Sequence, residues 1–439
     1  MKRKIYNKLL NWKEYGKKPL IVLGARQVGK TYIIDEFCQK EFKNHKKVNL
    51  LSDINILNLY NSEQSSIDKY KQLKILLNFD PEEDDSILFI DEAQESESLI
   101  SDLKFINEQF PKAKIILAGS LLGIQLKRLK KPFPVGKVDF IDLYPFDFEE
   151  FLMAKDRNDL IDMIKDCHIN NKMMPEMIHE LLISIYKEYL IVGGMPENVQ
   201  SYIDNQQDVS LLNDNILNDI NTAYINDMSR YTKSNEESIK IRKIYYSIAS
   251  QLANNSRKFQ YSKIESNARA STHESALNWL IYSGLVNISE CVSNPQKPIK
   301  GFVQNDVFKV YMSDVALLNK MLNVDYYDII SDNILTYKGV ITENYVANQL
   351  LSNGIPLNYW RNNNSAEIDF LIENKNGVIP VEVKSSDNKK AKSLNIYIDK
   401  YKPEYAIRIT SKNYGYNEKT RIKSVPLYSA FMLNDDTNK

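Results

Sequence analysis

The stretch at residues 24–31, GARQVGKT, is the most informative part of the sequence about the fold, because an apolar segment precedes it and an amphipathic one follows it. It fits the Walker A pattern G-x-x-x-x-G-K-[ST] and lies between PLIVL at 19–23 and YIIDEFCQ at 32–39. Glycines let such a loop curl so that its N–H groups face phosphate oxygens, and the dipole of a following helix favours the same negative charge. The stretch therefore predicts a strand, a phosphate-binding loop and a helix.

Each residue of this loop is a predicted contact of a bound nucleotide. The residues are Gly24, Ala25, Arg26, Gln27, Val28, Gly29, Lys30 and Thr31. Lys30 is expected to reach the β- and γ-phosphates, and the Thr31 hydroxyl to bind Mg²⁺. The predicted cofactors are ATP and Mg²⁺.

Two more apolar runs end in polar residues that suit the same chemistry. ILFIDE at 87–92 ends with Asp91, expected to hold the Mg²⁺, and Glu92, expected to orient or deprotonate the attacking water. IILAGS at 115–120 ends with Ser120, which could sense the γ-phosphate or could be an ordinary serine at a strand end. Apolar strands that alternate with helices indicate an α/β fold with a parallel sheet.

Hydrolysis at such a site usually also requires an arginine finger, from the same chain or from a neighbouring subunit. Arg128, Arg230 and Lys137 are the candidates, and the sequence does not rank them. Each could equally be an ordinary surface charge.

The composition sets limits on the kind of protein. The 439 residues are 43% hydrophobic, and 57 basic residues balance 57 acidic ones, so that contact with nucleic acid must come from local basic patches. The three cysteines, Cys38, Cys167 and Cys291, are far apart, which predicts free thiols in a reducing compartment. No run approaches the ~20 apolar residues that span a bilayer, so that a cytoplasmic location without a membrane partner is expected.

The remaining chain predicts three further parts. After a P-loop ATPase core at 1–145, helical patterns predict a lid or extension at 146–235. Short helices followed by two strands predict a winged-helix domain at 236–325, and a small α/β domain follows at 326–439.

The predicted recognition helix of the winged helix, STHESALNWLIYSG at 271–284, contains no Arg or Lys. Its expected buried positions are Ala276, Leu277, Leu280 and Ile281, and its expected outward positions are Thr272, His273, Glu274 and Asn278. Basic residues that could meet phosphates precede it, namely Arg257, Lys258, Lys263 and Arg269. DNA binding and a structural spacer both stay open.

The stretch AEIDFLIENKNGVIPVEVKSS at 366–386 predicts a hairpin with charges on one face. Pairing across the turn at 374–377 places Asp369 opposite Glu382 and Glu367 opposite Lys384. Opposed like charges destabilise a sheet, so that a cation such as Mg²⁺ is expected between the two acids. Lys384 could then stabilise an attacking hydroxide, although a solvated strand face with a salt bridge is the alternative.

The order of these motifs resembles a family of bacterial and archaeal AAA-type ATPases whose C-terminal domain has a restriction-endonuclease-like fold. The matching stretches are GARQVGKT, LFIDEAQE, LAGSLLG, FPVGKVDF, LYPFDFEEFL, YLIVGGMPE, ARASTHESALNWLIYSGLV, FKVYMSDVALL and EIDFLI with VIPVEVKSS. The resemblance implies ATP binding, a winged-helix middle and a nuclease-like end of the PD-(D/E)xK type. Its site there would comprise Asp369, Glu382 and Lys384, with Glu343 as the helical acid.

Two functions follow from these expectations. The first is a Mg²⁺-dependent ATPase that acts on nucleic acid through its C-terminal domain. The second is an ATP-controlled switch that binds a protein or DNA partner, with the C-terminal domain as a docking module that does not cleave. A homo-oligomer is compatible with both functions.

Overall fold

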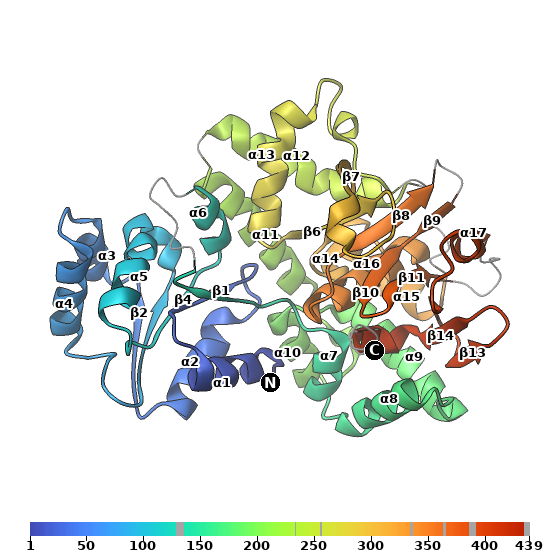
Figure 1. Ribbon diagram of the computed structural model, residues 1–439, viewed down its shortest axis with the longest axis horizontal. Coiled ribbons are helices and arrows are strands. Elements are labelled where there is room, and N and C mark those ends of the chain that lie inside the picture. Colours follow the sequence, from blue (N-terminus) through green and yellow to red (C-terminus); the bar gives the residue numbers. More distant parts are fainter. Residues whose placement is uncertain are drawn as a thin grey trace. The chain divides into compact units, whose positions relative to one another are not determined.

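The computed structural model describes residues 1–128, 136–232, 234–254, 257–333, 337–362, 366–385 and 392–433. The chain forms two compact units, one of residues 1–144 with 282–285 and one of residues 145–281 with 286–439. Figure 1 shows both units, and each is described by itself. The finer division into four domains stays a prediction.

The first unit is built on a parallel sheet of five strands in the order β2-β3-β4-β1-β5 (Figure 1). The strands are β1 (Leu20–Leu23), β2 (Asn44–Asn49), β3 (Ser86–Asp91), β4 (Ile115–Ala118) and β5 (Asp139–Asp142). All residues of β3 and β4 are buried, as expected for central strands that are covered on both faces. The α/β fold with a parallel sheet, which the sequence predicts, is confirmed.

Helices connect these strands. They are α1 (Ile5–Tyr15), α2 (Lys30–Glu41), α3 (Ile54–Asn61), α4 (Ser66–Leu77), α5 (Glu97–Gln109) and α6 (Leu122–Arg128), with the short 3-10 helix η1 (Ala93–Glu95). One hydrophobic cluster joins Leu88 and Leu117 of the sheet to Tyr60, Tyr70 and Leu103 of the helices. This core holds the carboxyl ends of the strands, where the predicted site residues lie.

The second unit begins with helices, and helical patterns are what the sequence shows for this region. They are α7 (Phe148–Ala154), α8 (Asn158–Asn170), α9 (Glu176–Val192), α10 (Pro196–Asp204) and α11 (Asp214–Arg230). Gly193 ends α9 with φ +71°, and Pro196 occupies the first turn of α10. The sequence GGMP therefore forms a turn between these two helices.

The middle of the second unit has the predicted order of helices followed by two antiparallel strands. These elements are α12 (Asn235–Leu252), α13 (Ala270–Tyr282), β6 (Val286–Val292) and β7 (Val303–Met312). However, β6 also pairs in parallel with β8 (Asn358–Asn362), and β9 (Ala366–Ile368) completes a sheet in the order β7-β6-β8-β9. The two strands are therefore part of a larger sheet, and a winged helix stays a prediction.

One predicted feature of α13 is wrong. His273 is buried rather than on the surface, and its Nε2 lies 3.2 Å from Glu265 Oε1. Ala276, Leu277 and Leu280 are buried, as the apolar spacing predicts.

The C-terminal part of this unit is a mixed sheet in the order β10-β11-β12-β14-β13 (Figure 1). Its strands are β10 (Phe370–Asn374), β11 (Gly377–Val383), β12 (Ala406–Thr410), β13 (Gly415–Asn417) and β14 (Ile422–Pro426). The helices of this region are α14 (Val315–Met321), α15 (Tyr326–Ile330), α16 (Lys338–Ser352) and α17 (Lys392–Tyr401).

The predicted hairpin is correct in its turn and wrong in its first strand. Phe370 pairs with Val381, which is the predicted register. The chain leaves the strand at Asp369, and Glu367 pairs instead with Arg361 of β8 in the other sheet. Glu367 therefore does not face Lys384, because a strand distant in sequence takes it as a partner.

Two predictions from composition can be compared with the structure. The three cysteines are buried and free. Within the described residues, no helix is both long and apolar enough to cross a bilayer.

Candidate functional site

The phosphate-binding loop lies between β1 and α2 and requires its glycines. Gly24 has φ +150°, and a Cβ atom there would lie 2.2 Å from the carbonyl oxygen of Leu143. Gly29 has φ +89° immediately before α2. A side chain at either position would strain the backbone, and at Gly24 it would also collide with a neighbouring strand connection.

Lys30 closes this loop from the inside. It is buried, and its Nζ donates hydrogen bonds to the carbonyl oxygens of Gly24 at 2.8 Å and Ala25 at 2.7 Å. The ammonium group is therefore held within the curl of the loop, next to the N-terminus of α2. Both features favour a negatively charged group at this position.

Thr31 and Asp91 are brought together from different elements. The Thr31 hydroxyl donates a hydrogen bond of 2.8 Å to Asp91 Oδ2, and the Glu92 N–H donates to Asp91 Oδ1 at 3.0 Å. Burial raises the pKa of the Asp91 carboxyl above its ordinary value, while these two hydrogen bonds act in the opposite direction. The two hard oxygens, on Thr31 and Asp91, fit a magnesium ion.

Glu92 adopts a left-handed backbone conformation, with φ +53°, directly after β3. Its Oε2 accepts a hydrogen bond of 2.5 Å from Gln94 Nε2. Gln94 in turn lies so close to Gly119 that a Cβ atom there would be 1.9 Å from Gln94 Oε1. Ser120 follows β4 at the same edge of the sheet, because β3 and β4 are parallel neighbours.

Two residues of this site are not found by motif reasoning. Gln94 is one, because LFIDEAQE draws attention only to its acids. The other is Arg3, whose guanidinium donates to the carbonyl oxygens of Val28 at 3.1 Å and Tyr144 at 2.7 Å. Arg3 thereby ties the phosphate-binding loop to the chain that follows β5. In the sequence, Arg3 is one of several basic residues at the N-terminus, and no motif distinguishes it from its neighbours.

The candidate arginine fingers are not distinguished by the structure. Lys137 forms an ion pair with Glu108 at 3.0 Å, and the Arg230 guanidinium lies 5.0 Å from the ring centre of Tyr231. Arg128 is the last residue of α6. All three stay candidates.

A second group of charged residues lies within the second unit, around Glu343 of α16. Glu343 is 1% exposed, and its Oε1 accepts hydrogen bonds from Tyr311 at 2.5 Å and Lys309 at 2.9 Å. Arg257 forms an ion pair with its Oε2. Three donors from the middle of the chain therefore hold the acid that the resemblance assigned to a nuclease site.

The other three predicted residues lie at the junction of β10 and β11. Asp369 Oδ2 accepts a hydrogen bond of 2.8 Å from the Val383 N–H, and Lys384 Nζ lies 2.8 Å from Glu382 Oε1. Burial raises the pKa of the Glu382 carboxyl, Lys384 lowers it, and the charge of Asp369 raises it further. Asp369, Glu382 and Lys384 are thus brought together.

The donor set of this second site fits one divalent ion at most. Glu382 is 1% exposed, and its Oε2 has no hydrogen-bond partner among the described residues. Within that same part of the chain, no three His, Cys, Asp or Glu side chains are grouped so that they could hold a metal ion. Two carboxylates, from Asp369 and Glu382, are available as hard oxygen ligands.

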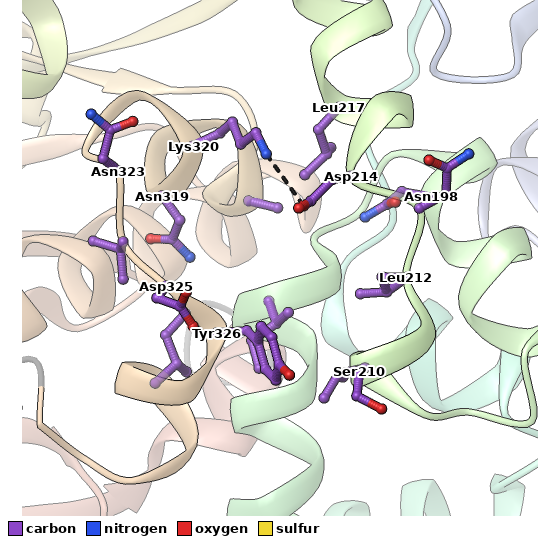
Figure 2. A pocket seen from close by; sticks show the side chains of 16 residues that line it. Asn198, Ser210, Leu212, Asp214, Leu217, Asn319, Lys320, Asn323, Asp325 and Tyr326 are labelled. Atoms are coloured by element: carbon purple, nitrogen blue, oxygen red, sulfur yellow. Dashed lines mark hydrogen bonds and ion pairs between the residues drawn. The ribbon is translucent and has the colours of Figure 1, made fainter.

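A cavity of about 340 Å³ is also present in the second unit. Figure 2 shows its lining, in which an ion pair of 3.2 Å joins Lys320 of α14 to Asp214 of α11. Asn198, Asn319 and Tyr326 also line it, and none of the predicted site residues does. The cavity is therefore separate from both groups of functional candidates.

Comparisons with protein families divide the chain into three matched segments. Residues 16–152 match the AAA domain, residues 183–328 match a domain of unknown function (DUF8612), and residues 338–429 match another (DUF4143). No curated protein matches the chain.

Solved structures show only a distant likeness. The Walker-type ATPase of Pyrococcus abyssi is 16% identical with a TM-score of 0.44, over 73% of this chain and 95% of that one. The ORC2 protein of Aeropyrum pernix, in ADPNP–ADP complexes, is 12% identical with a TM-score of 0.35, over 75% and 93%. At such low identities and TM-scores, the likeness does not assign a function to this chain.

The family match and the geometry of the loop agree with each other. Residues 16–152 match the AAA domain, and within them the parallel sheet carries the phosphate-binding loop and the acids after β3. The first unit therefore carries an ATPase domain of the AAA, P-loop type.

Proposed function

We propose that the first unit binds ATP together with Mg²⁺ and hydrolyses the γ-phosphate. The observation that carries this proposal is the hydrogen bond between Thr31 and Asp91, next to a loop that encloses the Lys30 ammonium. These groups come from a loop, a helix and a strand, and they meet at the carboxyl edge of the sheet. A nucleotide triphosphate with its metal ion matches their charges.

Each residue has a separate task in this mechanism. The N–H groups of the loop and Lys30 bind the phosphate oxygens, and Thr31 and Asp91 would hold the Mg²⁺, which offsets negative charge when bound. Glu92 orients the attacking water and accepts its proton. Ser120 lies beyond β4, where its hydroxyl can contact the γ-phosphate.

Two substitutions test this mechanism. Lys30→Ala should abolish measurable nucleotide binding, because it removes the buried cation from the loop. Glu92→Gln should keep binding and lower turnover by about 10²-fold or more, because the base is lost while the shape is kept. Binding is measured by calorimetry with ATP and Mg²⁺, and turnover by release of phosphate.

Lys40→Ala is the matched control, because Lys40 lies on the same helix with its side chain 61% exposed. It should leave both binding and turnover unchanged. Wild-type turnover in Lys30→Ala would refute the assignment.

For the second unit we propose metal-assisted cleavage of nucleic acid. The support is the meeting of Asp369, Glu382 and Lys384 at the end of β11. The two carboxylates would hold one divalent ion, which lowers the pKa of a bound water. That water would attack phosphorus and form a new P–O bond while the P–O bond to the sugar oxygen breaks, and the leaving oxygen would take up a proton from solvent. Lys384 would stabilise the negative charge on the phosphate oxygens.

The alternative is a docking module that binds a protein or DNA partner without cleaving it. The engagement of Glu343 by Lys309, Tyr311 and Arg257 favours this alternative, because an acid with three donors is poorly placed to bind a metal. In this case ATP turnover in the first unit would control the binding of the partner.

Plasmid cleavage with Mn²⁺, in the presence and absence of ATP, separates the two functions. Cleavage should disappear in Asp369→Asn and fall strongly in Lys384→Ala, which should still bind metal. Asp399→Asn, on the exposed face of α17, is the control and should cleave like the wild type. Absence of wild-type cleavage together with retained DNA binding would select the docking module.

We also propose that the chain assembles into a homo-oligomer when ATP is bound, since a neighbouring subunit can supply the arginine finger. Light scattering with a slowly hydrolysed ATP analogue tests this. A monomer at every concentration would exclude an arginine from a neighbour.

A further inference from the structure

The most unusual group in the second unit is a lysine that is completely buried. Lys309 of β7 has 0% exposure, and its Nζ lies 2.9 Å from Glu343 Oε1 and 2.7 Å from Glu367 Oε1. The same ammonium lies 4.9 Å from the ring centre of Tyr359. Two carboxylates and one aromatic ring therefore surround it.

The two acids come from different elements, α16 and β9. Buried carboxylates that approach one another need a positive charge between them, because their repulsion is strong in a medium of low dielectric constant. In metal-dependent sites a divalent ion supplies that charge. Here the ammonium of Lys309 bonds to both acids and supplies the charge from within the chain.

The second oxygen of Glu343 is also engaged. Arg257 pairs with Oε2, and the Tyr311 hydroxyl shares Oε1 with Lys309. Among the described residues, neither Glu343 Oε2 nor Glu382 Oε2 makes a hydrogen bond, but Arg257 forms an ion pair with the former, whereas the ion pair of Glu382, with Lys384, is to its Oε1. The acids therefore separate into two pairs: Glu343 and Glu367 share the ammonium of Lys309, whereas in the pair of Asp369 and Glu382 the Oε2 of Glu382 stays available to an ion.

We propose that Lys309 is a resident cation that replaces a metal ion between Glu343 and Glu367, so that this site recruits one divalent ion and not two. The proposal rests on the metal site proposed above for Asp369 and Glu382. It changes the role of Glu343, which becomes a positioning residue bound to Lys309 and not a metal ligand.

The proposal also explains why the site needs two segments of the chain. Lys309 lies in the segment that matches one family, whereas Glu343 and Glu367 lie in the segment that matches another. The ammonium thereby holds α16 and β9 against β7. Without it, two buried or half-buried carboxylates would lack their shared cation.

The first test is Mn²⁺ titration of the full chain without nucleotide, by calorimetry. The wild type should bind one ion that Asp369→Asn removes. Glu343→Gln should keep the Mn²⁺ affinity within about threefold, because Lys309 retains Glu367 and the ion lies elsewhere. If Glu343 is a ligand, Glu343→Gln removes one of the few hard oxygens that hold the ion, the affinity should fall far outside this range, and the proposal is then wrong.

The second test replaces Lys309 by a neutral residue or by another cation and measures how many ions are bound. Lys309→Met should create a second Mn²⁺ site, detected as one extra ion per chain and as a larger rise in Tm with Mn²⁺ than the wild type shows. Lys309→Arg keeps the charge and should gain no ion. The double variant Lys309→Met/Glu343→Gln should lose the extra ion again. A folded Lys309→Met chain without an extra ion would overturn the proposal.

The two proposals can fail separately. If the wild type binds no Mn²⁺ that depends on Asp369, the metal site of the proposed function is wrong, while an extra ion in Lys309→Met would still support the resident cation. If Lys309→Met folds only when Mn²⁺ is added, the proposal is supported directly. If Lys309→Met folds in neither condition, the Mn²⁺ affinity of Glu343→Gln, measured in the first test, decides whether the proposal holds.

Discussion

Gln94 shows how a neutral side chain can control an acid in the nucleotide site. Glu92 follows β3 in a left-handed conformation, which a non-glycine residue adopts at a cost of about 1 kcal/mol. The hydrogen bond from Gln94 Nε2 fixes its carboxylate, and the close approach to Gly119 fixes Gln94. The direction of this carboxylate, the proposed base, is therefore set by a residue two positions further along the chain.

We expect Gln94→Leu to lower the rate of ATP hydrolysis by about tenfold while the affinity for ATP stays the same, since the base loses its orientation but the phosphate contacts remain. Phosphate release and calorimetry measure the two quantities. An equal loss in both would show that Gln94 supports the fold of the loop instead.

The sequence predicts single residues where a backbone pattern requires them. The glycines and Lys30 could be predicted, because few other residues form such a loop. Lys309 could not, because in FKVYM it reads as an ordinary charged residue of a strand, and its partners are acids far along the chain. Its burial becomes visible only when α16 and β9 are placed beside β7.

At the scale of elements, the turn after α9 depends on α14. Asp314 is buried and caps α14 by accepting hydrogen bonds from the N–H groups of Ala316 and Leu317, and its other oxygen accepts one from the Gly194 N–H at 2.7 Å. A Cβ atom at Gly193 would lie 2.6 Å from Asp314 Oδ1. One carboxylate therefore fixes a helix start and a turn.

Asp314→Ala should lower the free energy of unfolding by about 2–4 kcal/mol, since it removes a helix cap and leaves a buried N–H without a partner. Chemical denaturation of the full chain, followed by circular dichroism, measures this. Asp325→Ala removes the cap of the short, exposed helix α15 and should cost less than about 1 kcal/mol. An equal loss of unfolding free energy in both variants would show that the burial of Asp314 does not add to the effect of its helix cap.

Strands show the same limit of sequence reasoning. The register of β10 with β11 follows from a local turn, in which Asn374 Oδ1 accepts hydrogen bonds from two N–H groups, and it was predictable. The break at Asp369 was not, because β9 pairs with β8, and the alternation of apolar and charged residues over 366–370 continues through Asp369. The sequence of one strand does not show that a strand of another sheet will pair with it.

At the scale of the whole molecule, the sheet β7-β6-β8-β9 joins the middle of the chain to its C-terminal part. Cys291 pairs with Tyr359 and Val292 with Trp360, and these four residues are buried. The contacts of Lys309, Tyr311 and Arg257 with Glu343 cross the same junction.

A fragment of residues 332–439 should therefore not fold by itself, because it exposes the edge of β8 and leaves the buried Glu343 without the cations of Lys309 and Arg257. A fragment of residues 145–439 keeps these contacts and should unfold in one cooperative transition. Circular dichroism with thermal melting compares them. Cooperative melting of the shorter fragment would show that the shared sheet is dispensable.

The pairing of β6 with β8 also restricts how such a chain can evolve. Recombination between genes preserves proteins when its crossover points fall between parts that share few contacts. A crossover between residues 328 and 338, where one matched family ends and the next begins, would combine β6 and β8 from different parents and separate Lys309 from its acids. The two segments are thus expected to be inherited together, as one unit of descent.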